Sequence, residues 1–145
     1  LLQHRFRLLP RPAAGVLQGG YVLWESTAKP DVILIATGSE VHIALDAAKV
    51  LAGKNVKLRV VSLPSWELFD KQPKEYRESV LPSAVRARVA IEAGRTVGWE
   101  HYVGLDGAII GIDRFGVSAP YATIYKEFGL TAEAVAAKAE ELLGK

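Results

Sequence analysis

The chain contains no cysteine, and no run of apolar residues approaches the length of a membrane span. Disulfide bonds therefore do not stabilise it, and the lack of cysteine fits a reducing compartment. A transmembrane helix needs about 20 consecutive apolar residues, and a signal peptide needs an apolar core near its N-terminus. Because the sequence shows neither pattern, we expect a soluble intracellular protein that does not associate with membranes.

A large charge of one sign is also missing. The net charge is +2, from 18 basic and 16 acidic residues. The excess comes from Arg5, Arg7 and Arg11, the only basic residues before residue 25, and without these three the remaining 15 nearly balance the acids. This basic segment could contact phosphate, but a solvated connector is the simpler interpretation because aromatic residues for base stacking are sparse there. We expect no nucleic-acid partner.

The sequence does contain a strong signal for a buried strand. Residues 32–36 (VILIA) form an unbroken apolar run, which is typical of a strand covered on both faces at the centre of a parallel sheet. Gly38 permits a tight turn after it. Ser39 is then predicted to cap a helix over 41–52, with Glu40 close to the positive end of that helix. The 145 residues, half of them apolar, are enough for one domain with its own core.

The rest of the chain repeats this alternation of strands and helices. Residues 1–20, interrupted by proline and glycine, are predicted to be a linker. We predict a three-layer α/β domain, with helices on both faces of a mostly parallel sheet. The further strands are predicted at 21–24 (an edge strand), 57–62, 88–93 and 108–112, and the further helices at 74–79, 96–102, 118–128 and after a cap at Thr131. Three aromatic residues fit either the core or a self-association surface: Trp66, Phe69 and Trp99.

The possible chemical motifs are all weak. Residues 37–40 lie where a phosphate loop would be, but they hold one glycine where the dinucleotide fingerprint needs three, so a structural turn is favoured. Ser118 resembles a nucleophile elbow, yet Pro120 follows it and a helix cap explains it better. The histidines His4, His42 and His101 have no paired-ligand spacing, and His42 is most simply a surface or boundary residue. From the residues alone, no catalytic or metal site is found.

Several longer stretches carry a family resemblance. They are GGYVL (19–23), DVILIATGSEV (31–41), RVVSLPSWELFDKQPKEYRESVLP (59–82), IEAG with GW (91–94 and 98–99), GIDRFGVSAP (111–120) and FGLTAEAVAAKAEELL (128–143). In this order and spacing they resemble the C-terminal domain of transketolase, over about residues 19–145. Related domains occur in 1-deoxyxylulose-5-phosphate synthase and in the β subunits of 2-oxo-acid dehydrogenases.

This resemblance implies a function for a longer protein. Transketolase is a homodimer of three-domain subunits that uses thiamine diphosphate and a divalent cation, Mg²⁺ or Ca²⁺. It transfers a two-carbon ketol unit between sugar phosphates in the pentose phosphate pathway and the Calvin cycle. The implied compartment is the cytoplasm, or a plastid in a plant.

The resemblance also implies a limited role for this chain. In the family, the N-terminal and middle domains bind the cofactor and the metal, and neither has a counterpart here. The C-terminal domain, a five-stranded mixed sheet, supplies packing and dimer contacts. We therefore expect residues 1–20 to be a linker and 21–145 to be this domain. We expect no catalytic, cofactor-binding or metal-binding residue in it, and no activity in isolation.

One stretch departs from the family pattern. Before this domain the family reads Ser-Arg-Gln-Asn-Leu-Pro, with an arginine that binds substrate phosphate. Aligning Leu9-Pro10 with the family's Leu-Pro puts Phe6 at the position of that arginine. Arg5 and Arg7, on either side, are the candidate substitutes for substrate binding. The alternative hypothesis is a stand-alone module that binds a phosphorylated or nucleotide ligand. Its site would be the crevice at the carboxyl ends of the strands, near Gly38, Ser65 and Gly94.

Overall fold

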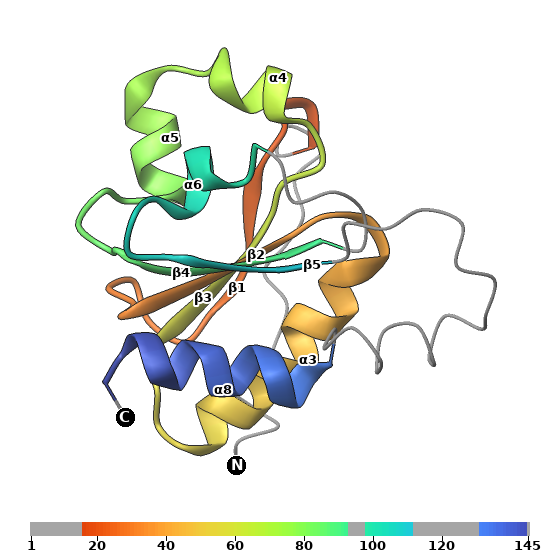
Figure 1. Ribbon diagram of the computed structural model, residues 1–145. Coiled ribbons are helices and arrows are strands. Elements are labelled where there is room, and N and C mark those ends of the chain that lie inside the picture. The colour runs from red at the N-terminus through yellow and green to blue at the C-terminus, as the bar shows by residue number, and fades with distance from the viewer. Residues whose placement is uncertain (1–15, 93–97, 112–130, 145) are drawn as a thin grey trace, which may run out of the picture.

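The computed structural model describes residues 16–92, 98–111 and 131–144, and it contains a five-stranded sheet between two layers of helices (Figure 1). The strand order is β1-β3-β2-β4-β5. The strands are β1 (Tyr21–Glu25), β2 (Val32–Ala36), β3 (Leu58–Ser62), β4 (Ala87–Glu92) and β5 (Ala108–Gly111).

Four of these strands are parallel and one is not. β2 pairs in parallel with β3 on one side and with β4 on the other, and β5 pairs in parallel with β4. β1 pairs with β3 in the antiparallel direction, at the edge of the sheet. The predicted mixed, mostly parallel sheet with an edge strand near residues 21–24 is therefore confirmed.

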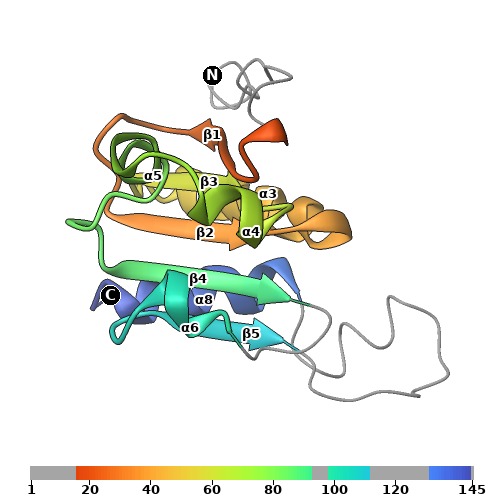
Figure 2. The same ribbon diagram turned by 90° about the horizontal axis from the view of Figure 1, so that it is seen from above.

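Helices cover both faces of this sheet, as Figures 1 and 2 show. The helices α3 (Val41–Gly53) and α8 (Ala132–Leu142) pack together on one face. The other face carries α4 (Trp66–Asp70), α5 (Lys74–Val80) and α6 (Glu100–Val103). The predicted three-layer α/β architecture is confirmed in these residues.

The central strand β2 is covered on both sides, as its composition predicts. All five of its residues are fully buried. Val32, Leu34 and Ala36 belong to the core under α3 and α8, whereas Ile33 and Ile35 belong to the core under α4, α5 and α6. Successive side chains of a strand point to opposite faces of the sheet, so a strand that is apolar at every position contributes to two separate cores.

Side-chain caps begin α4 and α8, whereas α3, α5 and α6 start without one. The Thr131 hydroxyl accepts a hydrogen bond from the Ala134 N–H, so the predicted cap of α8 is confirmed. Ser39 was predicted to cap the helix after β2, and this prediction is wrong. Ser39 lies inside a 3₁₀ turn, η1 (Gly38–Glu40), and Glu40 is the N-cap residue of α3. The turn runs directly into α3, which moves the capping position one residue along the chain.

Some predictions fall outside the described residues. These are most of the 1–20 linker, the helix at 118–128, and the first residues of the helix at 96–102, whose described part is α6 with Trp99 at its N-cap. In the described ranges, no helix is long and apolar enough to cross a membrane.

Candidate functional site

Gly38, Ser65 and Gly94 were predicted to line a binding crevice, and the structure places the first two just after the carboxyl ends of β2 and β3. Ser65 is already engaged in structural contacts: its hydroxyl accepts from the Leu68 N–H at 3.3 Å, and its N–H donates to the Gly19 carbonyl at 3.0 Å. Gly38 adopts a positive φ of 60° in the turn before α3. Gly94 lies outside the described residues.

The electrostatics of this turn do not favour an anion. Glu40 is only 6% exposed and occupies the N-cap position of α3. A carboxylate there is itself attracted to the positive end of the helix, and it repels phosphate. The turn interpretation of residues 37–40 therefore fits the structure better than a phosphate loop.

The structure instead brings aromatic residues together beneath α4 and α6. The ring centroids of Trp66 and Trp99 are 4.9 Å apart in an edge-to-face arrangement, and those of Trp66 and Tyr102 are 5.2 Å apart. Phe69 packs against Tyr76 and Tyr102 at 6.3 and 6.4 Å. Phe69 and Trp99 are buried, which confirms the core interpretation for both, while Trp66 is half-buried.

Polar groups at the margin of this cluster hold it in place. The Tyr102 hydroxyl donates to both carboxylate oxygens of Asp70, at 3.0 and 3.1 Å, and the Trp99 indole N–H donates to Glu92 at 3.2 Å. Burial, and then the Asp70 carboxylate, raise the pKa of Tyr102. The Tyr102 hydroxyl therefore keeps its proton and acts as a hydrogen-bond donor to Asp70. His101, mostly exposed, lies 3.8 Å from Asp70.

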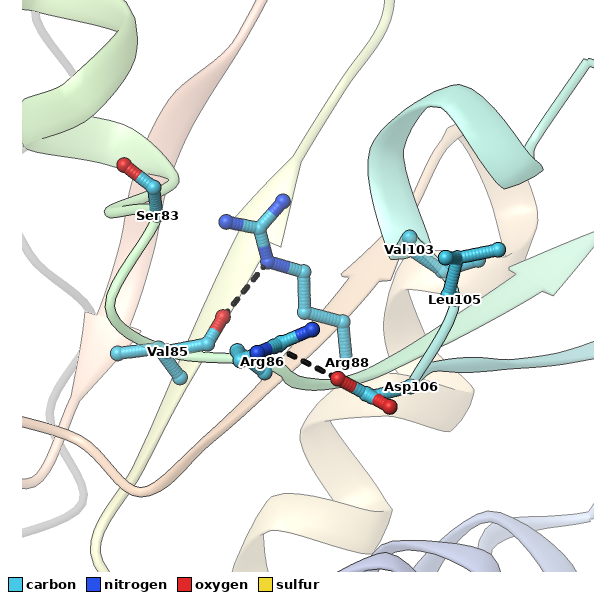
Figure 3. A pocket seen from close by; sticks show the side chains of 8 residues that line it. Ser83, Val85, Arg86, Arg88, Val103, Leu105 and Asp106 are labelled. Carbon is cyan, nitrogen blue, oxygen red and sulfur yellow. Dashed lines mark hydrogen bonds and ion pairs between the residues drawn. The ribbon is translucent and has the colours of Figure 1, made fainter.

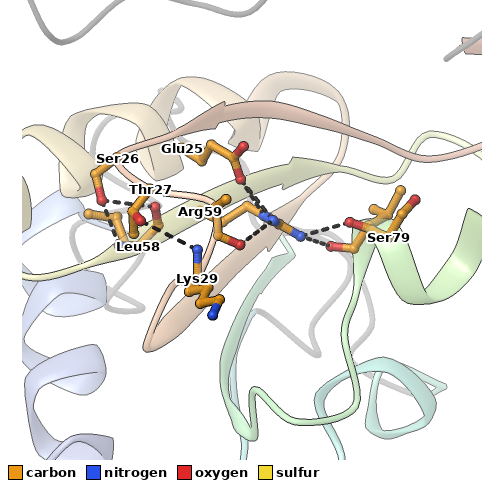
Figure 4. A network of polar contacts seen from close by, with 9 residues as sticks. Glu25, Ser26, Thr27, Lys29, Leu58, Arg59 and Ser79 are labelled. Atoms are coloured by element: carbon orange, nitrogen blue, oxygen red, sulfur yellow. Dashed lines mark hydrogen bonds and ion pairs between the residues drawn. The ribbon is translucent and has the colours of Figure 1, made fainter.

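A buried arginine connects the sheet to the same helical layer (Figure 4). Arg59 on β3 is only 5% exposed. Its Nε and one terminal nitrogen each lie 2.8 Å from a carboxylate oxygen of Glu25 on β1. The other terminal nitrogen donates to the carbonyls of Ser79 and Val80, at 2.9 and 3.0 Å. The charge is thus paired and hydrogen-bonded, as a buried cation requires.

A second arginine, Arg88 on β4, reaches the same helix end. Its side chain donates to four main-chain carbonyls and, among the described residues, to no carboxylate. Two of these carbonyls belong to Leu81 and Pro82, just after α5, and one belongs to Tyr102 in α6. Carbonyls at helix C-termini carry partial negative charge, so they stabilise the guanidinium. Burial lowers the pKa of Arg88.

Two cavities flank Arg88, one of about 230 Å³ and one of about 220 Å³, and Ser83 lines both. The larger lies where β4 and β5 begin, at the opposite end of the sheet from the predicted crevice (Figure 3). Its charged rim is an exposed ion pair between Arg86 and Asp106, at 2.6 Å. In the smaller cavity, Glu78 accepts two hydrogen bonds from Ser83. The polar groups that line these cavities thus serve internal contacts.

The described side chains offer no ready site for a divalent cation. Among the described residues, no group of three His, Cys, Asp or Glu side chains is placed to hold a metal ion. His42 is exposed on α3, which confirms its interpretation as a surface residue. His4, Ser118 and the two candidate phosphate-binding residues Arg5 and Arg7 lie outside the described part of the chain.

Arg59 and Arg88 were not among the residues predicted from the sequence to be functional, although the sequence contains a signal for them. Each interrupts an otherwise apolar strand, in LRVVS and ARVAIE. A charged side chain in such a run must find buried partners, so the pattern indicates a polar network. The partners themselves, the carbonyls after α5, follow only from the fold.

The fold and the described side chains thus define an α/β domain whose polar groups act mainly in holding helices to a sheet. Residues 19–131 match the family described as the transketolase-like TK C-terminal domain, which is more than half of the chain. The chain belongs to this family.

Known relatives support the same assignment. The chain is 60% identical over 131 residues to a chloroplastic transketolase from Craterostigma plantagineum, a match that covers 89% of this chain and 25% of the relative. Among solved structures, a Pichia stipitis transketolase in complex with sedoheptulose 7-phosphate has a TM-score of 0.83 and 40% identity, over 95% of this chain and 20% of that one. The chain therefore spans about a quarter or less of these relatives.

A second similar structure is a split-gene transketolase, described as an inactive β4 tetramer. Its TM-score is 0.66 at 26% identity, and the match covers 88% of this chain and 43% of that one.

Proposed function

We propose that this chain is the C-terminal domain of a transketolase and that it supplies packing and dimer contacts. The longer protein would transfer a two-carbon ketol unit between sugar phosphates of the pentose phosphate pathway or the Calvin cycle. The observation that carries this proposal is the family match over residues 19–131 in a chain that spans 25% of its Craterostigma relative.

The cofactors belong to the rest of the protein in this proposal. Thiamine diphosphate and Mg²⁺ or Ca²⁺ would be bound by the N-terminal and middle domains. The turn after β2 supports this division, because the buried Glu40 occupies the helix start there and would repel a diphosphate. This turn therefore does not fit a diphosphate.

We further infer that the isolated chain is catalytically inactive. The split-gene neighbour supports this inference, since it is an inactive assembly of a chain more than twice as long as the matched part. The polar side chains described above also engage one another or the main chain.

The proposal includes boundaries, partners and a compartment. Residues 1–20 would connect to the preceding domain and 21–145 would form this one. Arg5 or Arg7 would contact substrate phosphate in the complete enzyme. The functional unit would be a homodimer in the cytoplasm, or in a plastid as the name of the chloroplastic relative suggests.

An activity assay tests the proposal directly. The isolated chain and a full-length transketolase are each given xylulose 5-phosphate, an aldose phosphate acceptor, thiamine diphosphate and Mg²⁺. We expect turnover by the full-length enzyme and none by the chain. Ketol transfer by the chain alone would overturn the assignment of catalysis to the other domains.

A further inference from the structure

Exposed apolar side chains gather at one end of the domain. The large apolar residues that are exposed in the described part of the chain are Val16, Leu17, Val50, Leu68 and Leu105. Val50 and Leu105 are isolated on α3 and on the loop before β5. Val16, Leu17 and Leu68 form what we call the amino-terminal patch, because the first two begin the described chain and the third lies on α4.

Close main-chain packing places the turn that follows Val16 and Leu17 against α4, which carries Leu68. The turn at Val16 is closed by a hydrogen bond from the Gly19 N–H to the Val16 carbonyl, at 3.1 Å. A Cβ added to Gly19 would lie 2.8 Å from the Leu68 Cβ and closer still to the Ser65 carbonyl oxygen. The turn thus touches α4 directly, and only a glycine fits at the contact.

Further contacts fix the turn against the helical layer. The Ser65 N–H donates to the Gly19 carbonyl at 3.0 Å, and the Tyr76 hydroxyl donates to the Gly20 carbonyl at 2.6 Å. A Cβ on Gly20 would approach Leu63 and Phe69 within 2.8 Å. The patch is therefore a preformed surface, which lowers the entropic cost of binding a partner.

The exposure of the patch calls for an explanation. Leu17 is 71% exposed and Leu68 is 42% exposed, in a domain whose other large apolar residues are mostly buried. Neighbouring exposed apolar residues on a fixed surface are typical of contact sites. Three side chains, however, are far from the roughly 1,200 Å² that a stable complex between separate molecules buries.

A covalently joined partner needs less surface. Interfaces between domains of one chain are smaller and more polar than those of obligate complexes, and the connecting peptide raises the effective concentration of the partner. The family match is to a C-terminal domain in relatives about four to five times longer. A preceding domain would be joined to this one through residues 1–15, and the first described residue after them, Val16, belongs to this patch.

We propose that the amino-terminal patch is the surface on which the preceding domain of the transketolase chain packs. This inference rests on the proposed function. It assigns Leu17 and Leu68 a role in domain docking, and it assigns Gly19 and Gly20 the role of holding the docking surface against α4.

A domain exchange tests the proposal. Residues 16–145 replace the matching domain of the Craterostigma plantagineum transketolase, and hydrogen exchange of α4 is compared between this fusion and the isolated chain. We expect amide exchange in α4 to slow at least about tenfold in the fusion. The double variant Leu17→Lys with Leu68→Lys should lose this protection. The variant Leu105→Lys, matched in residue type and also exposed but placed before β5, should keep it.

The outcomes separate the two proposals. The isolated variants must melt at the temperature of the parent chain, which shows that the lysines do not unfold the domain. A fusion with parental ketol-transfer activity whose α4 exchange equals that of the isolated chain, or resists the double variant, overturns the docking surface alone. A well-folded fusion without activity overturns the proposed function, and the docking inference with it. Dimerisation of the isolated chain that the double variant abolishes would assign the patch to a second copy, against the proposal.

Discussion

Arg59 and Arg88 lie two strands apart in one row of the sheet and donate to four consecutive carbonyls. Both residues are paired in register with Ile33, which lies between them on β2. The carbonyls that they bind follow one another at the end of α5, and they belong to Ser79, Val80, Leu81 and Pro82. The last carbonyls of a helix have no partner within it, and Arg59 satisfies two of them in α5 while Arg88 binds the two carbonyls that follow.

This relationship explains how a short charged helix is held on the sheet. α5 has seven residues, and Val80 is its only fully buried one. A helix this short is not stable by itself, so most of its stability must come from tertiary contacts. The two arginines anchor its C-terminal end, and the aromatic contact between Tyr76 and Phe69 anchors its middle.

Removing one of these arginines should destabilise the domain strongly. We expect Arg59→Met to lower the free energy of unfolding by about 3 kcal/mol, because it strands the Glu25 carboxylate and two carbonyls in a largely buried place. Urea unfolding followed by tryptophan fluorescence measures this change. The control is Arg86→Met, which removes an exposed ion pair with Asp106 and should cost less than about 1 kcal/mol. Equal losses in the two variants would show that the buried network contributes little.

The two arginines should also act together. Because they hold the same helix end, we expect the losses from Arg59→Met and Arg88→Met not to add. Once one substitution has freed the end of α5, the second removes less stabilisation. The loss in free energy of unfolding of the double variant should therefore be smaller than the sum of the two single losses by about 0.5–3 kcal/mol. A double-mutant cycle in urea measures this coupling. Strict additivity would mean that each arginine stabilises a separate part of the fold.

The sheet could be predicted from the sequence because its strands have distinct apolar patterns. The unbroken run at 32–36 identified the buried centre, and β3 and β4 begin and end within one residue of their predicted bounds. The cap at Thr131 could also be predicted, because a threonine just before an apolar periodic segment typically accepts a hydrogen bond from the first turn of the helix. The first residue of α3 could not be predicted, because a 3₁₀ turn and a capped helix start have similar local sequences.

The polar network could not be predicted in the same way. The sequence shows that Arg59 and Arg88 need partners, but those partners are main-chain carbonyls 20 and 7 residues away. Which carbonyls lie within reach depends on how α5 crosses the sheet, and no local pattern encodes that. The same holds for the amino-terminal patch, where the turn at Gly19 packs against Leu68, a residue far along the sequence.

The contact at Gly19 leads to a third prediction. Gly19 and Gly104 both have a positive φ, 84° and 74°, so an alanine at either position is strained. A Cβ at Gly104 meets nothing within 4 Å, whereas one at Gly19 would overlap the Ser65 carbonyl oxygen. The backbone of Gly104, with a ψ of -173°, lies in a region that essentially only glycine adopts, so we expect Gly104→Ala to cost about 1–3 kcal/mol. We expect Gly19→Ala to cost about 2 kcal/mol more, because its Cβ also overlaps the neighbouring main chain. Thermal and urea unfolding measure both. Similar losses would mean that the turn moves away from α4 without cost.

The last prediction concerns alkaline pH. Burial, and then the Asp70 carboxylate, raise the pKa of Tyr102, so the folded state holds this proton more tightly than the unfolded chain does. The contribution of Tyr102 to stability is then complete below the unfolded pKa of about 10, and it declines as the pH rises from there toward the higher folded pKa. Tyr102→Phe removes both the hydrogen bond and this titration. We expect the variant to be about 1 kcal/mol less stable than the parent at about pH 8, and the gap to narrow or reverse above about pH 10. Urea unfolding of both proteins across this range measures the gap, and the other groups that titrate there cancel in the comparison. A gap that stays constant would mean that the Tyr102 hydroxyl is as free to ionise in the folded domain as in the unfolded chain.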